Sequence, residues 1–340
     1  MVISLGLERT ILWDQIRYTG SPEDFVWVLP VPSPEVEIEV ADNLFFAELE
    51  ASTAPQIFPR TLPVCPSDGG AGGFQDAGAG GGVTVYDEKV VGPYQTVVLG
   101  GDDSEGLVEW LTGNGYAIPE STVPAIDHYV ETGSVFIVLR LAPDQDVSAM
   151  QPIRVEFPGF MGSFPLKMVT VGAAGSLALT LWVIAEQRYT TPNYGSKPID
   201  PEQVRWNGSQ SNYRELFLKA VDDQGGKGWV TEFAGSANSF FFGSPQWSVI
   251  NEDHPYPYLT RLATEIRVDH IAEDLELAPD ADPSWVSNQF FPTVKGPSCG
   301  GSNGGNGGGY VSGCTSSGPA GGLGIVGLLL VAGLLLRRRL

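Results

Sequence analysis

The chain has 340 residues, of which 42% are hydrophobic, and a formal net charge of −21 at pH 7. This length and hydrophobic content suffice for one large domain or two ordinary ones with a well-formed core. A strongly acidic protein repels a phosphate backbone, and the basic side chains here are scattered among acidic ones. The composition therefore argues against nucleic-acid binding.

Strand-like segments recur from the start of the chain to its middle. They are rich in β-branched and aromatic residues, and several alternate apolar with polar positions, as strands with one buried face do. The Gly92-Pro93 pair predicts a turn between two of them. The predicted strands lie in residues 10–18, 24–40, 83–91, 94–101, 134–142, 153–159, 164–171 and 177–190.

Helices are predicted from their end signals. Asp42 is a capping residue before residues 43–52, a second helix starts near Ser104 and stops at Gly113, and a third has Pro124 in its first turn and Gly133 after its end. A fourth helix is predicted within residues 211–226. In the second helix we expect Leu107, Trp110 and Leu111 to face the core.

These segments predict the fold class and the division of the chain. Strands and helices do not alternate strictly, so we expect an α+β body with a β-rich mixed sheet and a few packed helices. Two glycine-rich stretches read as flexible, one a loop inside the body and one a spacer after it. The expected parts are the body at 1–295 with its mobile loop at 68–82, the linker at 296–313, and a tail at 314–340.

The tail predicts a transmembrane helix. Residues 320–336 carry no charge over 17 positions, are apolar on every side, and are followed by Arg337, Arg338 and Arg339. As a helix they would reach about 26 Å, at the short end of what a bilayer core requires. The positive-inside bias then places the three arginines in the cytoplasm and the body on the far side of the membrane.

The tail also resembles a known sorting signal. A Gly-Ser-Asn linker, one cysteine in "GCTSSGPAGG", a short apolar span and a terminal arginine cluster are similar to the myxobacterial C-terminal sorting tail of the MYXO-CTERM type. The resemblance implies that Cys314 is the signature cysteine, that an intramembrane protease cleaves near it, and that the body is displayed at the cell surface. The alternative is that the tail stays in place as a single-pass anchor.

Export requires a signal that the first residues do not show. "MVISLGLERT" has no basic start, no adequate apolar stretch and no small-residue cleavage site. Our hypothesis is that a signal peptide is encoded upstream of Met1. With Cys314 assigned to sorting, Cys65 and Cys299 form an even pair suited to a disulfide in an oxidising compartment, although cysteines in a preceding segment would be alternative partners.

A second resemblance covers most of the body. The pieces "ERTILWDQIRYTGSPEDFVWVLPVPS", "VGPYQTVVL", "WLTGNGYAIP", "YVETGSVFIVLRL", "PIRVEFPG" and "YLTRLATEI", in this order, resemble the bacterial domain-of-unknown-function family 2330 from Glu8 to Leu277. Members of that family resemble exported proteins. The family has no assigned activity, so the resemblance implies no catalytic residue.

Motifs for known chemistry are absent from the sequence. There is no GxSxG, HExxH, phosphate loop or EF-hand, and His128, His254 and His270 are isolated in sequence. Neither a metal nor a cofactor is therefore expected. Adjacent acids such as Asp102 with Asp103 are typical of solvated turns.

Aromatic residues are dense in residues 240–258. The candidates for a binding face are Phe241, Trp247, Tyr256 and Tyr258, and the alternative that we favour is a core-facing strand followed by an extended connector. The sequence thus predicts an exported, surface-anchored binding or structural module. The alternatives are an extracytoplasmic enzyme whose site is assembled from distant residues, and a subunit of an envelope complex.

Overall fold

The computed structural model describes residues 1–292 except 17, 19–20, 60–89, 102, 117, 119–121, 172 and 174. All the described residues belong to one compact unit of the chain, Met1–Gly296. Several predicted features lie outside them: the loop at 68–82, Cys65, Cys299, Cys314, the linker, the 320–336 span and Arg337, Arg338 and Arg339. No helix in the described part of the chain is long and apolar enough to cross a membrane.

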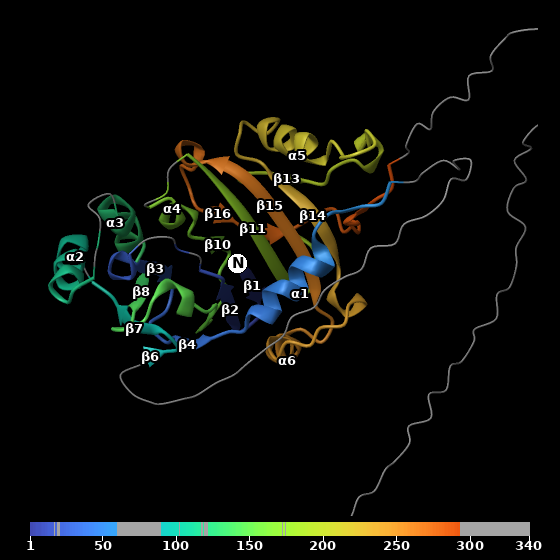
Figure 1. Cartoon of the computed structure of the whole chain (residues 1–340). Helices are drawn as coiled ribbons and strands as arrows, with labels where there is room; N and C mark the ends of the chain where they lie inside the picture. The colour runs from blue at the N-terminus through green and yellow to red at the C-terminus, as the bar shows by residue number, and fades with distance from the viewer. Residues whose placement is uncertain are drawn as a thin grey trace, which may run out of the picture. The chain divides into compact units, whose positions relative to one another are not determined.

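An eight-stranded sheet forms the centre of the unit (Figure 1). Its two longest strands pair with each other over ten residues, and two of its neighbouring pairs are parallel, β1 with β11 and β13 with β14. The sheet is therefore mixed, as predicted. In order across the sheet the strands are β13 (Ser196–Lys197), β14 (Trp229–Ser236), β15 (Tyr258–Arg267), β11 (Ser176–Ala185), β1 (Val2–Leu5), β2 (Arg9–Asp14), β9 (Ile153–Pro158) and β4 (Glu37–Val40).

A second, antiparallel sheet of four strands packs on the first. Its order is β3 (Val26–Val31), β8 (Val135–Leu141), β7 (Tyr94–Leu99) and β6 (Val90–Val91). Alternate residues of β8 point to opposite faces, so Ile137 and Leu139 meet the large sheet in the main core. The smaller pairs are β10 (Ser163–Phe164) with β16 (Leu275–Glu276), β12 (Tyr189–Thr190) with β17 (Ala278–Pro279), and β18 (Gln289–Phe290) with β5 (Gln56–Ile57).

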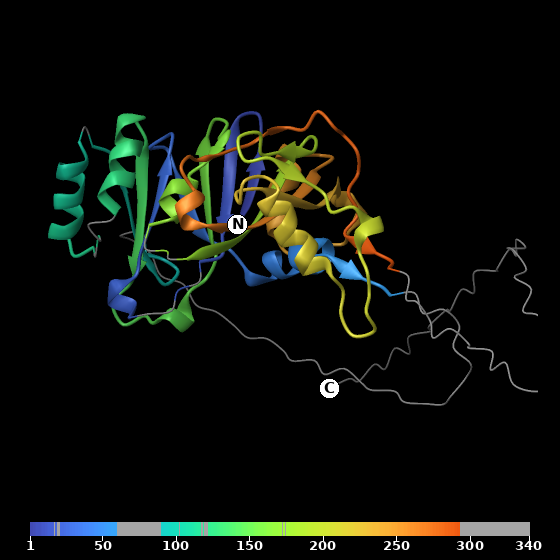
Figure 2. The same cartoon turned by 90° about the horizontal axis from the view of Figure 1, so that it is seen from above.

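Helices cover the outer faces of both sheets (Figure 2). Helices α1 (Asn43–Thr53) and α6 (Gln246–Asp253) pack on the large sheet around Trp13, and α5 (Tyr213–Asp222) packs on the same sheet around Val230. Helices α2 (Ser104–Gly113) and α3 (Val123–Glu131) cover the outer face of the four-stranded sheet. The two sheets therefore lie between two layers of helix, which confirms the predicted α+β class.

The helix ends follow the predicted signals. The carboxylate of Asp42 accepts a hydrogen bond from the Phe45 N–H at 2.7 Å at the start of α1. Helix α2 begins at Ser104 after a capping Asp103, and Gly133 adopts φ 75° after α3. These end signals are local, which is why they could be predicted from the sequence.

Three local predictions are wrong. Residues 164–171 form the short helix α4 (Leu166–Val169) after β10, because the distant carboxylate of Asp274 accepts the Lys167 N–H at 2.9 Å and caps the turn. The aromatic stretch contains helix α6 rather than a strand and an extended connector, because Trp247 and Ile250, three positions apart, bury the same helix face. Trp110 is 44% exposed, since Leu107 and Leu111 alone turn α2 toward the core.

Tyr194 gives a test of this packing at alkaline pH. Its ring is buried, its hydroxyl donates to the Glu273 carbonyl at 2.7 Å, and burial raises its pKa to about 12. In the unfolded chain the pKa of Tyr194 is near 10, as for ordinary tyrosine. The stability that the buried, neutral Tyr194 side chain contributes is therefore complete below pH 10 and is lost as the pH rises through about 12. Absorbance titration at 295 nm is expected to show a tyrosinate transition near pH 12 that Tyr194→Phe removes and Tyr256→Phe, at an exposed ring, does not.

Candidate functional site

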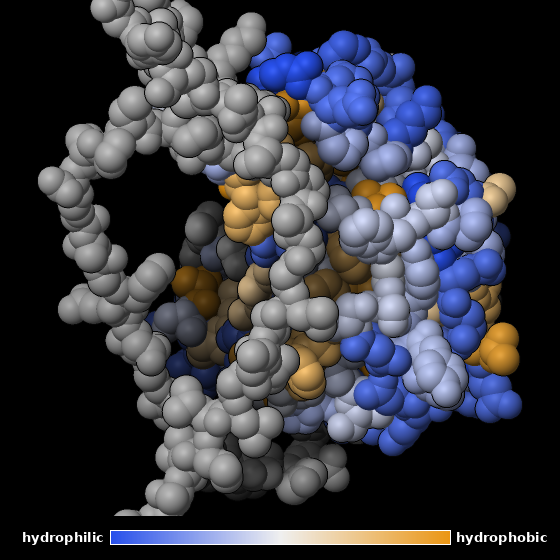
Figure 3. Space-filling view, turned by 90° about the vertical axis from the view of Figure 1, so that its right-hand side faces the viewer, coloured by the Kyte–Doolittle hydropathy of each residue, from blue (hydrophilic) through white to orange (hydrophobic). Residues whose placement is uncertain are grey.

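The aromatic residues predicted as a binding face do not gather on one surface. Phe241 and Tyr256 are exposed, but Trp247 is buried and stacks on Phe242 with 4.0 Å between ring centroids. Tyr258 is half-buried in β15. On the face that lies at the right in Figure 1, apolar side chains reach the surface at several places among polar ones (Figure 3).

A cavity of about 700 Å³ lies beside the inner faces of the two sheets. One wall is the N-terminal half of β11 together with residues that follow β2, and the other is β3 with α4. Met1 also lies on its wall, and the N-terminus is near the centre of the unit in Figures 1 and 2. The volume falls within the range of sites for small molecules and peptide side chains.

Strand β11 borders the cavity beyond its pairing with β1. Strand β11 pairs with β15 along its whole length, whereas β1 pairs only with Trp182–Ile184. Among the described residues, 176–179 have a strand partner only in β15, and the Thr180 carbonyl also accepts a hydrogen bond from the Met1 nitrogen at 3.1 Å. Burial changes at the same point, since residues 176–180 are exposed or half-buried and residues 181–185 are buried.

A second strand edge borders the same cavity. Strand β3 is the outermost strand of its sheet and pairs only with β8 among the described strands. Phe25 and the next four residues all line the cavity, although alternate residues point to opposite faces of the sheet. The cavity therefore meets β3 along its open edge.

Two residues of the wall carry a buried polar atom that has no hydrogen-bond partner among the described residues. These atoms are the indole Nε1 of Trp229 and the hydroxyl of Thr122, in side chains that are 1% and 3% exposed. An unpaired polar group in a protein interior costs about 1–3 kcal/mol. Both polar atoms are themselves buried, although their residues border the cavity.

The charged side chains of the cavity are acidic. Asp14 accepts a hydrogen bond from Trp27 Nε1 at 3.1 Å, and burial raises the pKa of its carboxyl above the ordinary value. Asp24 lies exposed on the lining, and no lysine, arginine or histidine side chain is among the described lining residues. The remaining wall is mainly aliphatic and aromatic, so the site suits a neutral or basic ligand with apolar parts.

A smaller cavity of about 260 Å³ adjoins the first. It shares Gln15, Ile16 and Tyr18 with the larger one and continues toward Asn43 and Met150. The two cavities thus border the same short segment that follows β2.

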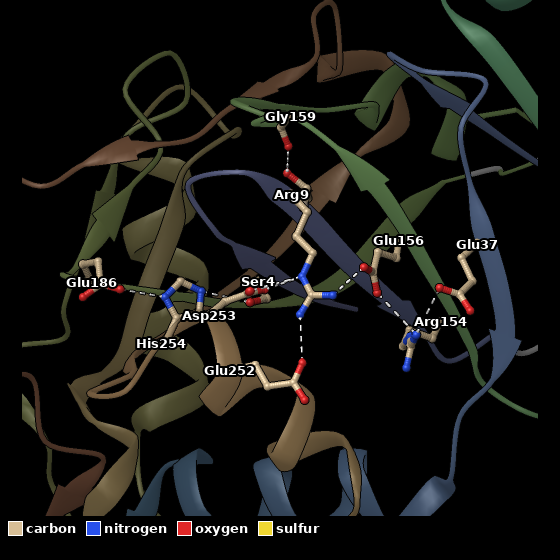
Figure 4. Close-up of polar contacts among 11 residues, drawn as sticks. Ser4, Arg9, Glu37, Arg154, Glu156, Gly159, Glu186, Glu252, Asp253 and His254 are labelled. Carbon is tan, nitrogen blue, oxygen red and sulfur yellow. Dashed lines mark hydrogen bonds and ion pairs between the residues drawn. The ribbon is translucent and has the colours of Figure 1, made fainter.

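The structure also brings together three residues that resemble a hydrolase triad (Figure 4). The Ser4 hydroxyl lies 3.0 Å from His254 Nε2, and Glu186 lies 3.0 Å from His254 Nδ1. Because a carboxylate only accepts, Nδ1 carries a proton, and in the neutral ring Nε2 accepts the hydroxyl proton of Ser4. The arrangement is that of a hydrolase triad, in which a histidine accepts the serine proton and a carboxylate orients the histidine.

The position of Ser4 does not suit a nucleophile. Ser4 is fully buried in β1, which is paired with a strand on each side, and Ser4 lines neither cavity. A serine nucleophile stands on an exposed turn where substrate reaches its oxygen. In this structure the three residues join the end of α6 to the centre of the sheet.

Two clusters of ion pairs also link different strands and helices of the fold. Arg9 pairs with Asp253 at 2.8 Å and with Glu156 at 2.5 Å, which links β2, α6 and β9 (Figure 4). Arg261 in β15 pairs with the buried Glu232 at 2.7 Å and with Glu50 of α1 at 2.6 Å. Neither cluster lines either of these two cavities, so both are interpreted as structural.

Sequence reasoning did not identify Asp14, Thr122 or Trp229 as site residues. Asp14 is the last residue of the mainly apolar strand β2, where a polar residue ordinarily marks the strand end. Thr122 and Trp229 lie more than one hundred positions apart, and only the fold brings both to the border of one cavity. No local pattern marks them. Among the described residues, no group of three acidic, histidine or cysteine side chains is placed to hold a metal ion.

The fold and site define an α+β protein with two sheets and a partly open cavity beside them. The chain belongs to the family described as "Uncharacterized protein conserved in bacteria (DUF2330)", whose family model matches residues 2–278. This confirms the second resemblance drawn from the sequence. No curated protein and no solved structure matches the chain.

Proposed function

We propose that this protein is a binding module of the bacterial cell envelope and that the cavity beside β11 is its binding site. One observation carries the proposal: a cavity of about 700 Å³ with mainly aliphatic and aromatic walls lies beside the two sheets. A ligand with apolar groups would remove apolar wall area from water.

Binding can be tested with the neutral carbonyl dye Prodan, which is apolar and offers one acceptor. We expect saturable, blue-shifted fluorescence with the wild-type protein. Leu179→Trp, which fills part of the cavity, is expected to weaken dye binding at least tenfold. Trp110→Ala, at an exposed side chain on α2, is the matched control and should bind as the wild type does. Equal dye binding by wild type and Leu179→Trp would show that the cavity is not the site.

We further propose that the body acts outside the cytoplasm, held or sorted by the tail. The uncharged span at 320–336, Cys314 and the terminal Arg337, Arg338 and Arg339 support this proposal, as does the resemblance to a sorting signal. The partners that follow are the membrane and a sorting protease. The proposal includes a signal peptide, encoded upstream of Met1, that directs export of the body.

Intact-mass analysis of protein recovered from the native cell envelope tests the proposed location. A mature chain that ends near Cys314 supports sorting, and one that retains Arg337 to Arg339 in an envelope fraction supports a permanent anchor. Recovery of the complete chain in the cytosolic fraction would contradict both.

A further inference from the structure

We propose that the smaller cavity, of about 260 Å³, binds an uncharged sugar ring. This inference goes beyond the proposed function, because it concerns a second site and a different class of ligand, and it stands whether or not the larger cavity holds a ligand. Its basis is a group of three carboxamide residues that the ends of three strands bring to one cavity.

The register of the large sheet explains why these residues meet. Strand β9 lies between β2 and β4, and its first residue, Ile153, pairs with Asp14 at the end of β2 and with Val40 at the end of β4. The three strands therefore stop at one level of the sheet. Just beyond that level, the residues that line the smaller cavity include Gln15 after β2, Gln151 before β9 and Asn43 at the start of α1.

The cavity lies on the side of β2 that faces β9. Strand β1 pairs with the opposite side of β2, and Met1 is not among the described residues of this lining. The site is therefore formed by β2, β9 and α1 and does not depend on the edge of β11.

The carboxamides match the hydroxyl groups of a sugar. Each carboxamide carries a donor nitrogen and an acceptor oxygen, and a hydroxyl group likewise donates and accepts. Gln15 Nε2 donates to Asn43 Oδ1 at 3.2 Å, which holds these two amides side by side and keeps Asn43 Nδ2 as a donor. The Tyr94 hydroxyl donates to the Gln151 carbonyl at 2.6 Å and accepts from the Gln151 N–H at 3.0 Å, so the backbone that carries the third amide is fixed.

The rest of the lining suits the apolar face of a sugar ring. Half-buried Tyr18 lies on the wall that the two cavities share, against Phe25 with 5.4 Å between ring centroids. Together with Ile16, Val147 and Met150, it offers apolar surface to the C–H groups of a pyranose. Apolar surface with a few placed polar groups is the usual composition of a small-molecule site.

The absence of charge from this lining argues against other small ligands. None of the eight described residues that line the smaller cavity is acidic or basic. A phosphate or carboxylate would find no cation among them, and a divalent metal ion would find no carboxylate. A purely apolar molecule would displace water from the amides without replacing its hydrogen bonds. An uncharged ligand with several hydroxyl groups fits best.

The probes are the methyl glycosides of glucose, galactose, mannose and N-acetylglucosamine, added to the full chain in a detergent without a sugar headgroup. We expect saturation-transfer difference NMR to show saturable binding of at least one of them. The uronic acid form of the best ligand, in which a carboxylate replaces the C6 hydroxymethyl group, is expected to bind at least tenfold more weakly.

Two protein variants test the site. Gln151→Leu and Asn43→Leu each remove one amide, and neither residue lines the larger cavity, so we expect at least tenfold weaker sugar binding with unchanged Prodan binding. Gln151→Leu leaves the bonds to Tyr94 in place, because they use the backbone of residue 151. Gln210→Leu, at an exposed amide outside both cavities, is the matched control and should bind the sugar as the wild type does.

The outcomes separate this inference from the proposed function. If no probe binds, or if both leucine variants bind the sugar as the wild type does, the sugar site is overturned, and Prodan binding still decides the role of the larger cavity. Equal or tighter binding of the uronic acid form would overturn the assignment to an uncharged sugar. If a sugar binds and Prodan does not, the sugar site stands and the proposed site beside β11 fails.

Discussion

Replacing Arg261 with methionine is expected to destabilise the protein by about 3–5 kcal/mol, because it leaves a buried carboxylate without its cation. Arg261 and Glu232 are 5% and 6% exposed, and the guanidinium also lies 5.0 Å above the Trp182 ring. Glu232 is the extra residue of a bulge in β14 opposite Arg261, and its other oxygen accepts the Tyr213 hydroxyl at 3.0 Å. The measurement is urea unfolding followed by circular dichroism at neutral pH.

Two further variants show whether the loss comes from the unpaired charge. Arg261→Met combined with Glu232→Met is expected to recover most of the stability, because exchanging a whole buried pair for apolar residues is often neutral. Glu50→Gln removes only the half-exposed partner and is expected to cost less than about 1 kcal/mol. A double variant as unstable as the sum of both single variants would contradict the buried-charge explanation.

The helices of this fold could be predicted more readily than the centre of its sheet. The ends of α1, α2 and α3 depend on caps and glycines close in sequence. Strands β14 and β15 were not predicted, because their buried faces carry Glu232 and Arg261 rather than an apolar series. Those side chains are buried only because they meet each other, which is a property of the tertiary structure.

The cavity could not be predicted for a related reason. It depends on the register of β1 against β11, two strands that are about 180 positions apart in sequence. The apolar run of β11 correctly indicated a central strand, and Leu181–Ala185 are buried as expected. Neither strand records locally which residues of the other lie beside it.

The same limit applies to the cluster of Ser4, His254 and Glu186. His254 was interpreted as an isolated imidazole, since its neighbours in sequence offer no partner pattern. The structure places it 1% exposed, between a serine 250 positions away and a glutamate 68 positions away. Only packing of α6 on β1 brings these groups together.

His254→Ala is expected to destabilise the protein by about 3 kcal/mol, measured by urea unfolding, because it leaves a buried gap and removes the partner of the buried Ser4 hydroxyl. Glu186→Gln is the matched control: the Glu186 side chain is 61% exposed, and an amide oxygen still accepts from Nδ1, so a loss below about 1 kcal/mol is expected. Because Ser4 is fully buried, diisopropyl fluorophosphate should leave it unmodified in the folded protein. Rapid labelling of Ser4 that His254→Ala abolishes, with little loss of stability, would instead show that the three residues act as a hydrolytic site.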